Sequence, residues 1–372
     1  MKRGYYVSFG DRTSVGVDSK IEMQVKELRK YCEVEFIKQP KKKRGLGERI
    51  LNFLPWIDNK WDYDSLFIKL NKPDFLYVRR VEAGTNYINF LKKIRQRFPK
   101  CKILIEVPTY PYDKEYWGTI DVLFLLKDIF YRKKIKNYVD KLVTYSRDEE
   151  IWSVPTIRTQ NGVDVNKNSL IAPREYSQNE IHLIAVALFQ KHHGYERVIQ
   201  GIGNYYKKNN SMHRKARDIF FHVVGDGPER KKYERLSQKL HIENRIIFHG
   251  MMKGKEQDKV FSECDIALSV FGLYKQSSNY TSPIKTAEYL ARGVPVISGC
   301  PESAFRRERT RFFLEFPNNE SSLNMEKVIK FYDKLFFPEG NYFIREEIRE
   351  YAKETVDIAI VMKPIIDYVL TE

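Results

Sequence analysis

Short apolar runs alternate with amphipathic stretches along most of the first half of the chain. Short runs of apolar residues predict strands, and apolar residues three and four positions apart predict helices. The predicted strands cover residues 5–9, 33–38, 75–79, 102–107, 141–145 and 154–158, and the predicted helices cover residues 19–31 and 86–98. This alternation favours a parallel, doubly wound sheet with helices on both faces.

The same alternation restarts after a polar stretch at residues 166–180. Predicted strands follow at residues 182–187, 219–224, 245–249, 266–270 and 295–298, with predicted helices at residues 195–207, 230–240, 257–264 and 283–292. Because 372 residues exceed the usual size of a single core, two domains are expected. We therefore predict an α/β protein with two Rossmann-like domains facing each other across a cleft.

The predicted domain boundaries follow from that restart. The N-terminal domain is expected to span residues 1–168, and the C-terminal domain residues 169–351. The final helical stretch, residues 344–370, is expected to cross back, so that residues 352–372 complete the N-terminal domain.

Cysteine usage and hydropathy narrow the class of protein. The chain has four scattered cysteines, without the spacing of a metal site or a disulfide framework, so they are expected to be reduced core residues. No run of about 18 apolar residues is present, and the N-terminus lacks the apolar stretch of a signal peptide. We therefore expect a cytoplasmic protein.

The formal net charge of +16 indicates an anionic partner. Basic residues cluster just ahead of an aromatic and apolar stretch, as in a peripheral membrane anchor. The chain has no helix-turn-helix, zinc-finger or RNP-type signature, so a nucleic acid is not the expected partner. We expect peripheral association with the anionic inner face of the cytoplasmic membrane. The residues expected to contact the membrane or acceptor are Lys41, Lys42, Lys43, Arg44, Trp56 and Trp61.

Residues 279–297, NYTSPIKTAEYLARGVPVI, carry the clearest chemistry. Ser282 is expected to cap a helix whose first residue is Pro283. Because proline has no N–H, the amides of Ile284 and Lys285 would point at an anion, and the Lys285 side chain would add a positive charge. Glu288 lies one turn further along the same face, spaced to hold the diol of a ribose.

Two other strand ends could approach a phosphate. Gly225 and Gly227 flank an aspartate in VVGDGPER, which predicts a tight turn with close backbone approach. His193 follows a predicted strand in QKHHGYERVI. Gly16, between the first strand and helix, could bring the backbone close to a ligand, and Lys20 on that helix is expected to reach the cleft.

Together these segments resemble the retaining family-4 type of glycosyltransferase over nearly the whole chain. The resemblance rests on NGVD at residues 161–164, GDGPER followed by RIIFHG, and YTSPIKTAEYLARGVPVI. The S-P-x-K-x-x-E-Y variant, HHGY and PTYPYD are similar to enzymes of bacterial capsular and extracellular polysaccharide assembly. The resemblance implies transfer of a sugar from a nucleotide-diphosphate sugar to a lipid-linked or glycan acceptor, with retention and without a metal or other cofactor.

The expected donor site combines these motifs. It comprises Gly16, Gly225, Gly227, Gly250, Met251, Tyr280, Thr281, Ser282, Pro283, Ile284, Lys285 and Glu288. The residues expected to act in catalysis are Glu288, Lys285, His193, Tyr110 and Thr109.

The sequence departs from the family pattern in three places. Of the paired glutamates that bracket seven residues, only Glu288 is present, since the first position is Tyr280. The arginine and lysine of the second domain's first loop are replaced by Leu188 and His193, so His193, Lys285 and Lys191 are the expected substitutes. The N-terminal half has no histidine, so Thr109, Tyr110 and Asp113 in PTYPYD are expected near the sugar or acceptor.

Three other classes of protein are compatible with parts of this pattern. A two-domain nucleotide-sugar epimerase shares the architecture but releases an epimer without an acceptor. A catalytically silent scaffold of a polysaccharide assembly complex would be consistent with the missing glutamate and arginine. A nucleic-acid-binding protein would account only for the charge.

Overall fold

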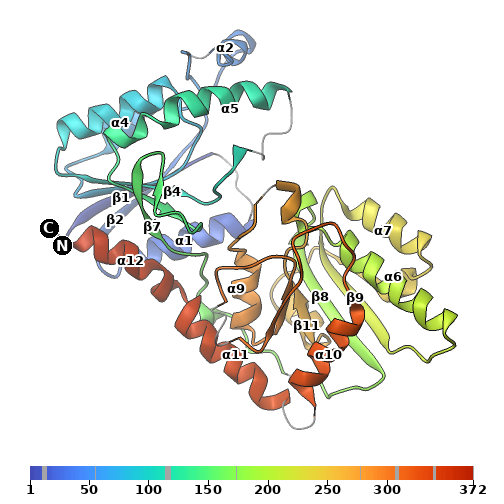
Figure 1. Cartoon of the computed structure of the whole chain (residues 1–372). Coiled ribbons are helices and arrows are strands. Elements are labelled where there is room, and N and C mark those ends of the chain that lie inside the picture. Colours follow the sequence, from blue (N-terminus) through green and yellow to red (C-terminus); the bar gives the residue numbers. More distant parts are fainter. Residues whose placement is uncertain are drawn as a thin grey trace. The chain divides into compact units, whose positions relative to one another are not determined.

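The computed structural model describes residues 1–10, 15–54, 56–113, 119–172, 174–276, 278–305, 310–337 and 341–371. The chain forms two compact units, Met1–Gln160 with Val361–Glu372, and Asn161–Ile360 (Figure 1). The chain thus enters the second unit at residue 161 and returns to the first at residue 361. The sequence pattern places these two changes near residues 169 and 352.

The first unit is a mainly parallel sheet covered by helices. Its strands are β1 (Arg3–Phe9), β2 (Glu33–Gln39), β3 (Phe75–Arg79), β4 (Lys102–Val107), β5 (Lys141–Thr144), β6 (Glu150–Ile151) and β7 (Val154–Arg158), and its helices are α1 (Val15–Leu28), α2 (Leu46–Leu51), α3 (Tyr63–Lys69), α4 (Thr85–Arg97), α5 (Thr119–Arg132) and most of α12 (Ile358–Leu370). The strand order is β2-β1-β3-β4-β5-β7-β6, and only β6 and β7 pair antiparallel. Helices α4 and α5 cover one face, and α1 and α12 cover the other (Figure 1).

Burial on both faces explains why these strands appear in the sequence as short continuous apolar runs. In β3, Phe75, Leu76, Tyr77 and Val78 are all fully buried. The three strands β3, β4 and β7 begin and end where the apolar pattern predicts.

The second unit is a parallel sheet with helices on both faces. Its strands are β8 (Glu180–Leu188), β9 (Asp218–Asp226), β10 (Ile246–Gly250), β11 (Ile266–Leu268), β12 (Val296–Ser298) and β13 (Phe313–Glu315), and its helices are α6 (Glu196–Ser211), α7 (Arg230–Lys239), α8 (Lys255–Ser262), α9 (Ile284–Ala291), α10 (Met325–Phe336) and α11 (Asn341–Thr355). The strand order is β10-β9-β8-β11-β12-β13. Helices α6 and α7 lie on one side of the sheet, and α9 and α11 on the other (Figure 1). The two sheets confirm the predicted pair of Rossmann-like folds.

Each sheet has one place where the strand order reverses. In the first sheet β1 lies between β2 and β3, and in the second β8 lies between β9 and β11. Along the chain, β1 is followed by its neighbour on one side, β2, and then by its neighbour on the other side, β3. In the second sheet β8 is followed by β9 and β10 on one side and then by β11 on the other. Ligands of open α/β sheets bind at the carboxyl ends of the strands at such points. The loops after β1 and β3, and after β8 and β11, are therefore the places to search for sites.

The C-terminal helical stretch is two helices rather than one. Val163 of the NGVD segment occupies the break, because its N–H donates to Val356 O at 3.0 Å and its carbonyl accepts from Ile358 N at 2.8 Å. The Asp357 carboxylate also accepts from Val165 N at 3.2 Å. The NGVD segment therefore separates α11 from α12.

The apolar pattern does not predict α2, α3, α5 or α10. Helix α5 shows why, because Val122, Leu123, Leu126 and Phe130 are exposed apolar residues that blur the contrast between its two faces. All four cysteines are buried and unpaired, as the sequence predicts.

Candidate functional site

Helix α9 begins at Ile284 and presents an uncapped first turn. Pro283 is the N-cap residue, with an extended backbone (φ −73°, ψ 134°), and no side chain caps the helix. The N-cap side chain therefore accepts no hydrogen bond from the main-chain N–H groups of Ile284, Lys285 and Thr286, and the helix dipole adds partial positive charge there. A helix does begin in this segment, and its role in binding an anion stays a prediction.

The predicted capping role of Ser282 is wrong. Its hydroxyl instead accepts a hydrogen bond of 2.7 Å from the main-chain N–H of Asn161, and the Asn161 side chain donates to the Ser282 carbonyl. Because Ser282 is engaged with the NGVD segment, the amides of α9 stay available. The NGVD segment thus binds the residues just before α9 and also the residues between α11 and α12.

The loops after β8 and β11 are joined at the point where the second sheet reverses its strand order. His193 O accepts from Phe271 N at 2.8 Å, and His192 O accepts from Gly272 N at 3.0 Å. A Cβ at Gly272 would lie 2.6 Å from Lys191 O, so only glycine allows this approach. The join fixes η4 (Lys191–His193) beside the carboxyl ends of both strands.

His193 is a buried neutral donor rather than the cation expected from the sequence. Burial, with Lys285 and His192 nearby, lowers its pKa well below 6.5. Its Nδ1 accepts a hydrogen bond of 3.0 Å from Gln190 N, which assigns the ring proton to Nε2. His193 can therefore offer one N–H to a ligand, without positive charge.

Lys285 lies in the first turn of α9 and contacts Tyr195, next to the start of α6. Its Nζ donates a hydrogen bond of 2.9 Å to the Tyr195 hydroxyl. The Tyr195 ring stacks on His193, with ring centroids 5.7 Å apart. Burial lowers the pKa of Lys285 to about 7, against the opposing effect of Glu302 and Glu288. The structure therefore brings Lys285 and His193 together, as predicted, through a tyrosine that the sequence did not single out.

Two carboxylates lie near Lys285. Burial raises the pKa of Glu288, opposed by Arg292 and Lys285, and its carboxylate has no hydrogen bond or ion pair within the described part of the chain. Glu302 is 3% exposed and accepts 2.6 Å from the Ser298 hydroxyl. Glu302 was not predicted from the sequence, because this residue lies in an irregular segment after β12 with no motif around it.

The remaining residues of the expected donor site have mixed roles. Gly225 and Gly227 have φ of +123° and +150°, and a Cβ at these positions would lie 2.0 Å from Ala187 O and 2.5 Å from Phe189 N. Both glycines are thus required by packing against the end of β8. Gly250 has φ of +73° with open space beside it, and Met251 is 64% exposed.

Tyr280 and Thr281 lead into α9 along a short pairing with the chain after β12. Thr281 N donates to Pro301 O at 3.3 Å, and Thr281 O accepts from Ser303 N at 3.0 Å. This pairing places Glu302 opposite Thr281. The pairing therefore holds Glu302, which was not predicted, beside the residues that lead into α9.

In the first unit, the expectation that Lys20 reaches a cleft is wrong. Lys20 is 3% exposed, and its Nζ lies 2.9 Å from Glu106 Oε1, which is itself fully buried. Gln24 and Tyr77 also donate to Glu106, at 3.1 and 2.6 Å. A buried carboxylate needs this compensation, so Lys20 holds α1 on the sheet.

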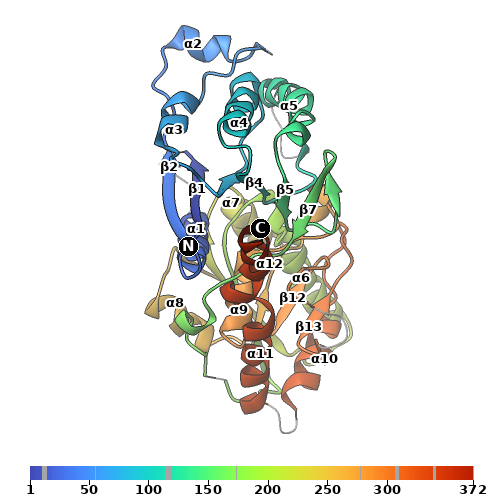
Figure 2. The ribbon, with the colours of Figure 1, turned by 90° about the vertical axis from the view of Figure 1, so that its left-hand side faces the viewer.

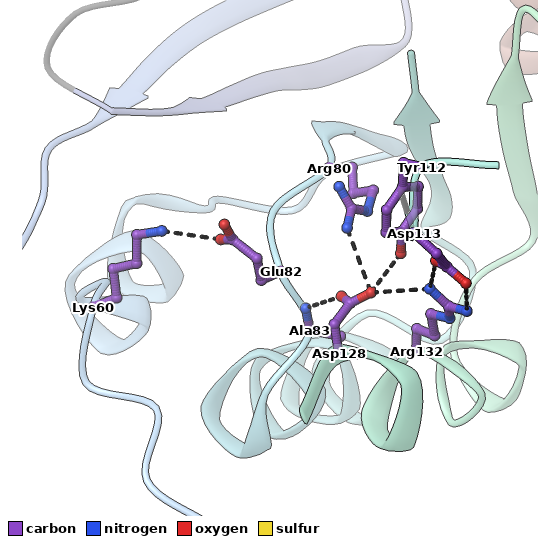
Figure 3. A network of polar contacts seen from close by, with 8 residues as sticks. All are labelled: Lys60, Arg80, Glu82, Ala83, Tyr112, Asp113, Asp128 and Arg132. Carbon is purple, nitrogen blue, oxygen red and sulfur yellow. Dashed lines mark hydrogen bonds and ion pairs between the residues drawn. The ribbon is translucent and has the colours of Figure 1, made fainter. Parts of the chain in front are cut away.

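The loop after β4 is tied to α5 through Asp128 (Figure 3). The Asp128 carboxylate accepts from the Tyr112 hydroxyl at 2.5 Å and from Ala83 N at 2.7 Å. Asp113 pairs with Arg132 at 2.6 and 3.1 Å, so its role is to hold this loop.

Three further expected residues of the first unit lie at its surface or nearby. Thr109 is exposed, and Tyr110 is half-buried with its ring centroid 6.2 Å from that of Trp152. A Cβ at Gly16 would meet no atom within 4 Å, so packing does not require glycine there. Their expected contacts with sugar, acceptor or diphosphate stay predictions.

The basic–aromatic segment, which was expected to anchor the protein at a membrane, is only partly exposed. Lys42 and Lys43 are exposed, and Trp56 is 65% exposed. Trp61, in contrast, is 6% exposed and packs on Phe9 with ring centroids 5.2 Å apart, so its expected membrane contact is wrong. Lys41 pairs with Trp61 through an isolated β-bridge, and Arg44 donates to Asn59 at 2.9 Å.

Among the residues that the structure describes, no three His, Cys, Asp or Glu side chains are grouped so that they could hold a metal ion. None of the helices formed by those residues combines the length and apolar character needed to cross a membrane.

Comparison with known proteins identifies the second unit. Residues 167–334 match the family described as glycosyl transferases group 1. No curated protein matches the chain in sequence.

Solved structures resemble the chain over its whole length. They include the lipopolysaccharide outer core galactosyltransferase WaaB (13% identity, TM-score 0.60, 99% of each chain covered) and sucrose-phosphate synthase from Thermosynechococcus elongatus (13%, 0.64, 99% of each chain). Anabaena Alr3699/HepE, solved with UDP and glucose, is 10% identical with a TM-score of 0.62, covering 100% of both chains. At such identities the likeness shows a shared fold.

The sequence match and the shared fold agree with the resemblance seen in the motifs. The group 1 match spans η4, the uncapped start of α9 and Glu288, which are the residues that the structure brings together. The chain therefore carries a glycosyltransferase group 1 domain within the two-sheet architecture of glycosyltransferases.

Proposed function

We propose that the protein transfers a sugar from a nucleotide-diphosphate sugar to a lipid-linked or glycan acceptor in the assembly of a bacterial surface polysaccharide, with retention of configuration and without a metal. The observation that carries the proposal is the uncapped first turn of α9, with Lys285 in it and the His193 ring close by. This cluster lies at the reversal point of the second sheet, where such folds bind ligands.

Each group of the cluster has a defined part in this proposal. The N–H groups of Ile284, Lys285 and Thr286 bind the diphosphate, whose negative charge grows as the sugar departs. Oriented donors stabilise such charge without reorganising at the moment of reaction. Lys285 supplies a positive charge, and the His193 Nε2–H supplies a neutral hydrogen bond. Glu288 accepts hydrogen bonds from the ribose.

Ligands of proteins with the same fold favour a uridine nucleotide as the first donor to test. HepE was solved with UDP and glucose, and a trehalose-6-phosphate protein from E. coli (12% identity) with UDP-2-fluoro glucose. WaaB is named as a galactosyltransferase of the lipopolysaccharide outer core, which supports a surface-glycan acceptor here. The polysaccharide role, the retention and the absence of a metal rest on the motif resemblance.

The donor site is tested by thermal unfolding with UDP, GDP, dTDP and their sugars. A ligand at 100 times its dissociation constant stabilises the folded state by about 2.7 kcal/mol. We expect Glu288→Ala to weaken the best ligand at least tenfold, about 1.4 kcal/mol, because the ribose hydroxyls lose their acceptor.

The matched control for Glu288→Ala is Glu263→Ala, which removes a carboxylate from the C-cap of α8 in the same unit. Equal ligand affinity of the Glu288→Ala variant and the parent protein would remove Glu288 from the site. Failure of every nucleotide to stabilise the parent protein would contradict the proposed function and favour a silent scaffold.

An exposed apolar surface in the first unit supports membrane association. Helix α2 and the chain after it pack against α5, since Phe53 and Phe124 have ring centroids 5.2 Å apart and Lys127 Nζ donates to Asn52 O at 3.3 Å. Helix α2 lies outside the layer of α4 and α5, away from the sheet (Figure 2). The exposed apolar residues of the two segments are Leu46, Ile50, Leu51, Trp56, Val122, Leu123, Leu126 and Phe130.

Lys42 and Lys43 lie in the chain leading to this surface and are exposed, which suits an anionic bilayer. We expect Lys42→Gln/Lys43→Gln to weaken binding to phosphatidylglycerol-containing vesicles by about 2 kcal/mol, roughly thirtyfold, at about 1 kcal/mol for each basic residue. Leu126→Ser/Phe130→Ser should weaken binding to the same vesicles by loss of apolar contact. Vesicle sedimentation measures both.

The control for the vesicle assay is Lys231→Gln/Lys239→Gln, which removes two exposed lysines from α7 of the second unit. Equal sedimentation of all variants with anionic vesicles would count against a membrane contact at this surface. Donor binding should be unchanged in every one of them.

A further inference from the structure

A cavity of about 570 Å³ opens at the reversal point of the first sheet. Phe9 and Gly10 line it at the end of β1, and Arg80 and Glu82 line it just after β3. Because β1 is the central strand where the strand order reverses, this is the place where an open α/β sheet binds a ligand. The described residues that line the cavity all belong to the first unit, whereas the cluster around α9 belongs to the second.

The charge of the cavity favours an anion. Lys41, Lys60 and Arg80 line it together with one carboxylate, Glu82, which leaves an excess of two positive charges. Lys60 Nζ lies 3.0 Å from Glu82 Oε2. Burial alone would raise the pKa of Glu82, but Lys60 outweighs it and lowers the pKa. The Glu82 carboxylate therefore stays ionised and neutralises only part of the positive charge around it.

Arg80 is held in place before any ligand arrives. Its guanidinium lies 3.5 Å from the centroid of the Tyr112 ring and 3.4 Å from Asp128 Oδ2 (Figure 3). Asp128 also accepts from Ala83 N, which fixes the loop that carries Arg80 and Glu82. An orienting network of this kind reduces the ordering cost of binding.

Trp61 gives the cavity an apolar wall beside its three cations. It is 6% exposed and packs on Phe9, which also lines the cavity, with ring centroids 5.2 Å apart.

We propose that this cavity binds a phosphoryl or pyrophosphoryl group of the acceptor, between Lys41, Lys60 and Arg80. The inference rests on the proposed glycosyl transfer, because it assigns the cavity to the second substrate. A phosphate has three or more oxygens for several cations at once, and arginine matches it with two parallel N–H groups. A lipid-linked phosphate and a soluble sugar phosphate offer the same group, so the experiment separates these two sources.

The first measurement is calorimetric titration of inorganic pyrophosphate into the full chain, with UDP present to occupy α9. Lys41→Gln/Lys60→Gln is expected to weaken pyrophosphate binding at least about tenfold, since charge-assisted hydrogen bonds are lost. Glu82→Gln is expected to tighten binding, because a negative charge leaves the cavity. A general loss of structure would not tighten binding, and thermal unfolding of each variant checks its fold.

The matched control is Lys231→Gln/Lys239→Gln, which also removes two lysine charges, from exposed positions of α7 outside the cavity lining. Its affinity for pyrophosphate should stay within about twofold of the parent protein. Equal weakening by both double substitutions would overturn the proposal, as would unchanged affinity in the Glu82→Gln variant.

The second measurement identifies the source of the phosphate. Glucose 6-phosphate competes with pyrophosphate if the cavity accepts a soluble sugar phosphate. If the cavity accepts a lipid, phosphatidylcholine vesicles with phosphatidic acid compete instead, and Lys41→Gln/Lys60→Gln abolishes that competition. Competition by neither would overturn the proposal for an acceptor phosphate.

Stabilisation by UDP, measured on the same variants, reports the proposed function separately. If UDP stabilises all of them and pyrophosphate binds equally to all, the transferase proposal stands and the cavity is not the acceptor site. If UDP stabilises none while the pyrophosphate pattern holds, the cavity binds anions and the transferase proposal fails.

Discussion

Lys285→Gln is expected to weaken the binding of the nucleotide sugar about ten- to a hundredfold and to remove most of its pH dependence. The estimate follows from the loss of charge-assisted hydrogen bonds to the diphosphate, each contributing about 1.5–3 kcal/mol. Lys285 is the only lysine in the first turn of α9, and its Nζ is already oriented by the Tyr195 hydroxyl at 2.9 Å. Calorimetric titration of a UDP-sugar at several pH values measures both effects.

The direction of the pH dependence follows from linkage. In the free protein burial lowers the pKa of Lys285 to about 7. A bound diphosphate favours the charged ammonium and raises that pKa, so binding takes up a proton. Affinity should therefore fall as pH rises above about 7, by at most tenfold for each pH unit, until the pKa of the complex is reached. The phosphates of a UDP-sugar carry no proton that titrates in this range.

The two histidines near Lys285 do not produce the same slope. Burial lowers the pKa of His192 to about 4 and that of His193 further, so both rings are neutral around pH 7. Lys239→Gln, an exposed lysine at the end of α7, is the control and should keep the full pH dependence. A Lys285→Gln variant with the affinity and slope of the parent protein would exclude Lys285 from donor binding.

The strands were the most predictable part of the fold. Strands covered on both faces appear as short apolar runs, and β3, β4 and β7 match their predicted bounds, whereas the short strands β6 and β13 were not predicted. Helix α5 could not be predicted in the same way, since its exposed Leu126 and Phe130 weaken the contrast on which periodicity depends.

The position of the candidate site was predictable, but the partners of its residues were not. The proline in SPIK marks the start of α9 in the local sequence, but the absence of a side-chain cap was not predicted, because Ser282 was expected to provide one. The contact of Ser282 with Asn161 joins residues 121 positions apart, and no local pattern reports such a pair. Glu302 was missed for the same reason, because its proximity to Lys285 exists only after β12 and α9 have packed.

Charged residues in helices posed the same difficulty. Lys20 and Lys285 both follow a glycine- or proline-containing helix start, and both were expected to face a ligand. In the structure the two lysines have different roles, because Lys20 Nζ lies 2.9 Å from the buried carboxylate of Glu106. The local sequence around a lysine does not show whether the fold places a carboxylate from another part of the chain beside it.

Lys20→Met is expected to destabilise the first unit by about 3 kcal/mol at neutral pH, at the lower end of the range for a broken buried ion pair. The side chains of Lys20 and Glu106 are 3% and 0% exposed, so the substitution leaves a buried carboxylate without its nearest cation. Arg79 remains 3.4 Å from Glu106 and limits the loss. Hydrogen exchange of peptides from β3 and β4 measures the effect, with second-unit peptides as the internal control.

Acidification should change this destabilisation in a direction that distinguishes a lost ion pair from lost packing. In the parent protein burial opposes ionisation of Glu106, but Lys20 and Arg79 outweigh it and lower its pKa to about 2. That contribution to stability is present above the ordinary value of 4.5 and is lost only as pH falls towards 2. Without Lys20 the pKa of Glu106 rises, so the variant carries an uncharged, protonated Glu106 at pH values where the parent protein still holds the ionised form.

A loss of about 3 kcal/mol corresponds to a rise of about two pKa units from about 2, so the difference in stability between parent and Lys20→Met should shrink as pH falls from about 5 towards 2. Taking the difference cancels the acid sensitivity of other groups, such as His182 and His222, whose pKa values are lowered to about 4 and 3 in both proteins. Lys20→Met/Glu106→Gln should be less destabilised at pH 7 than Lys20→Met alone, because no buried charge is left unpaired. A difference that stays constant with pH would mean that Lys20 contributes by packing and that Glu106 does not depend on its charge.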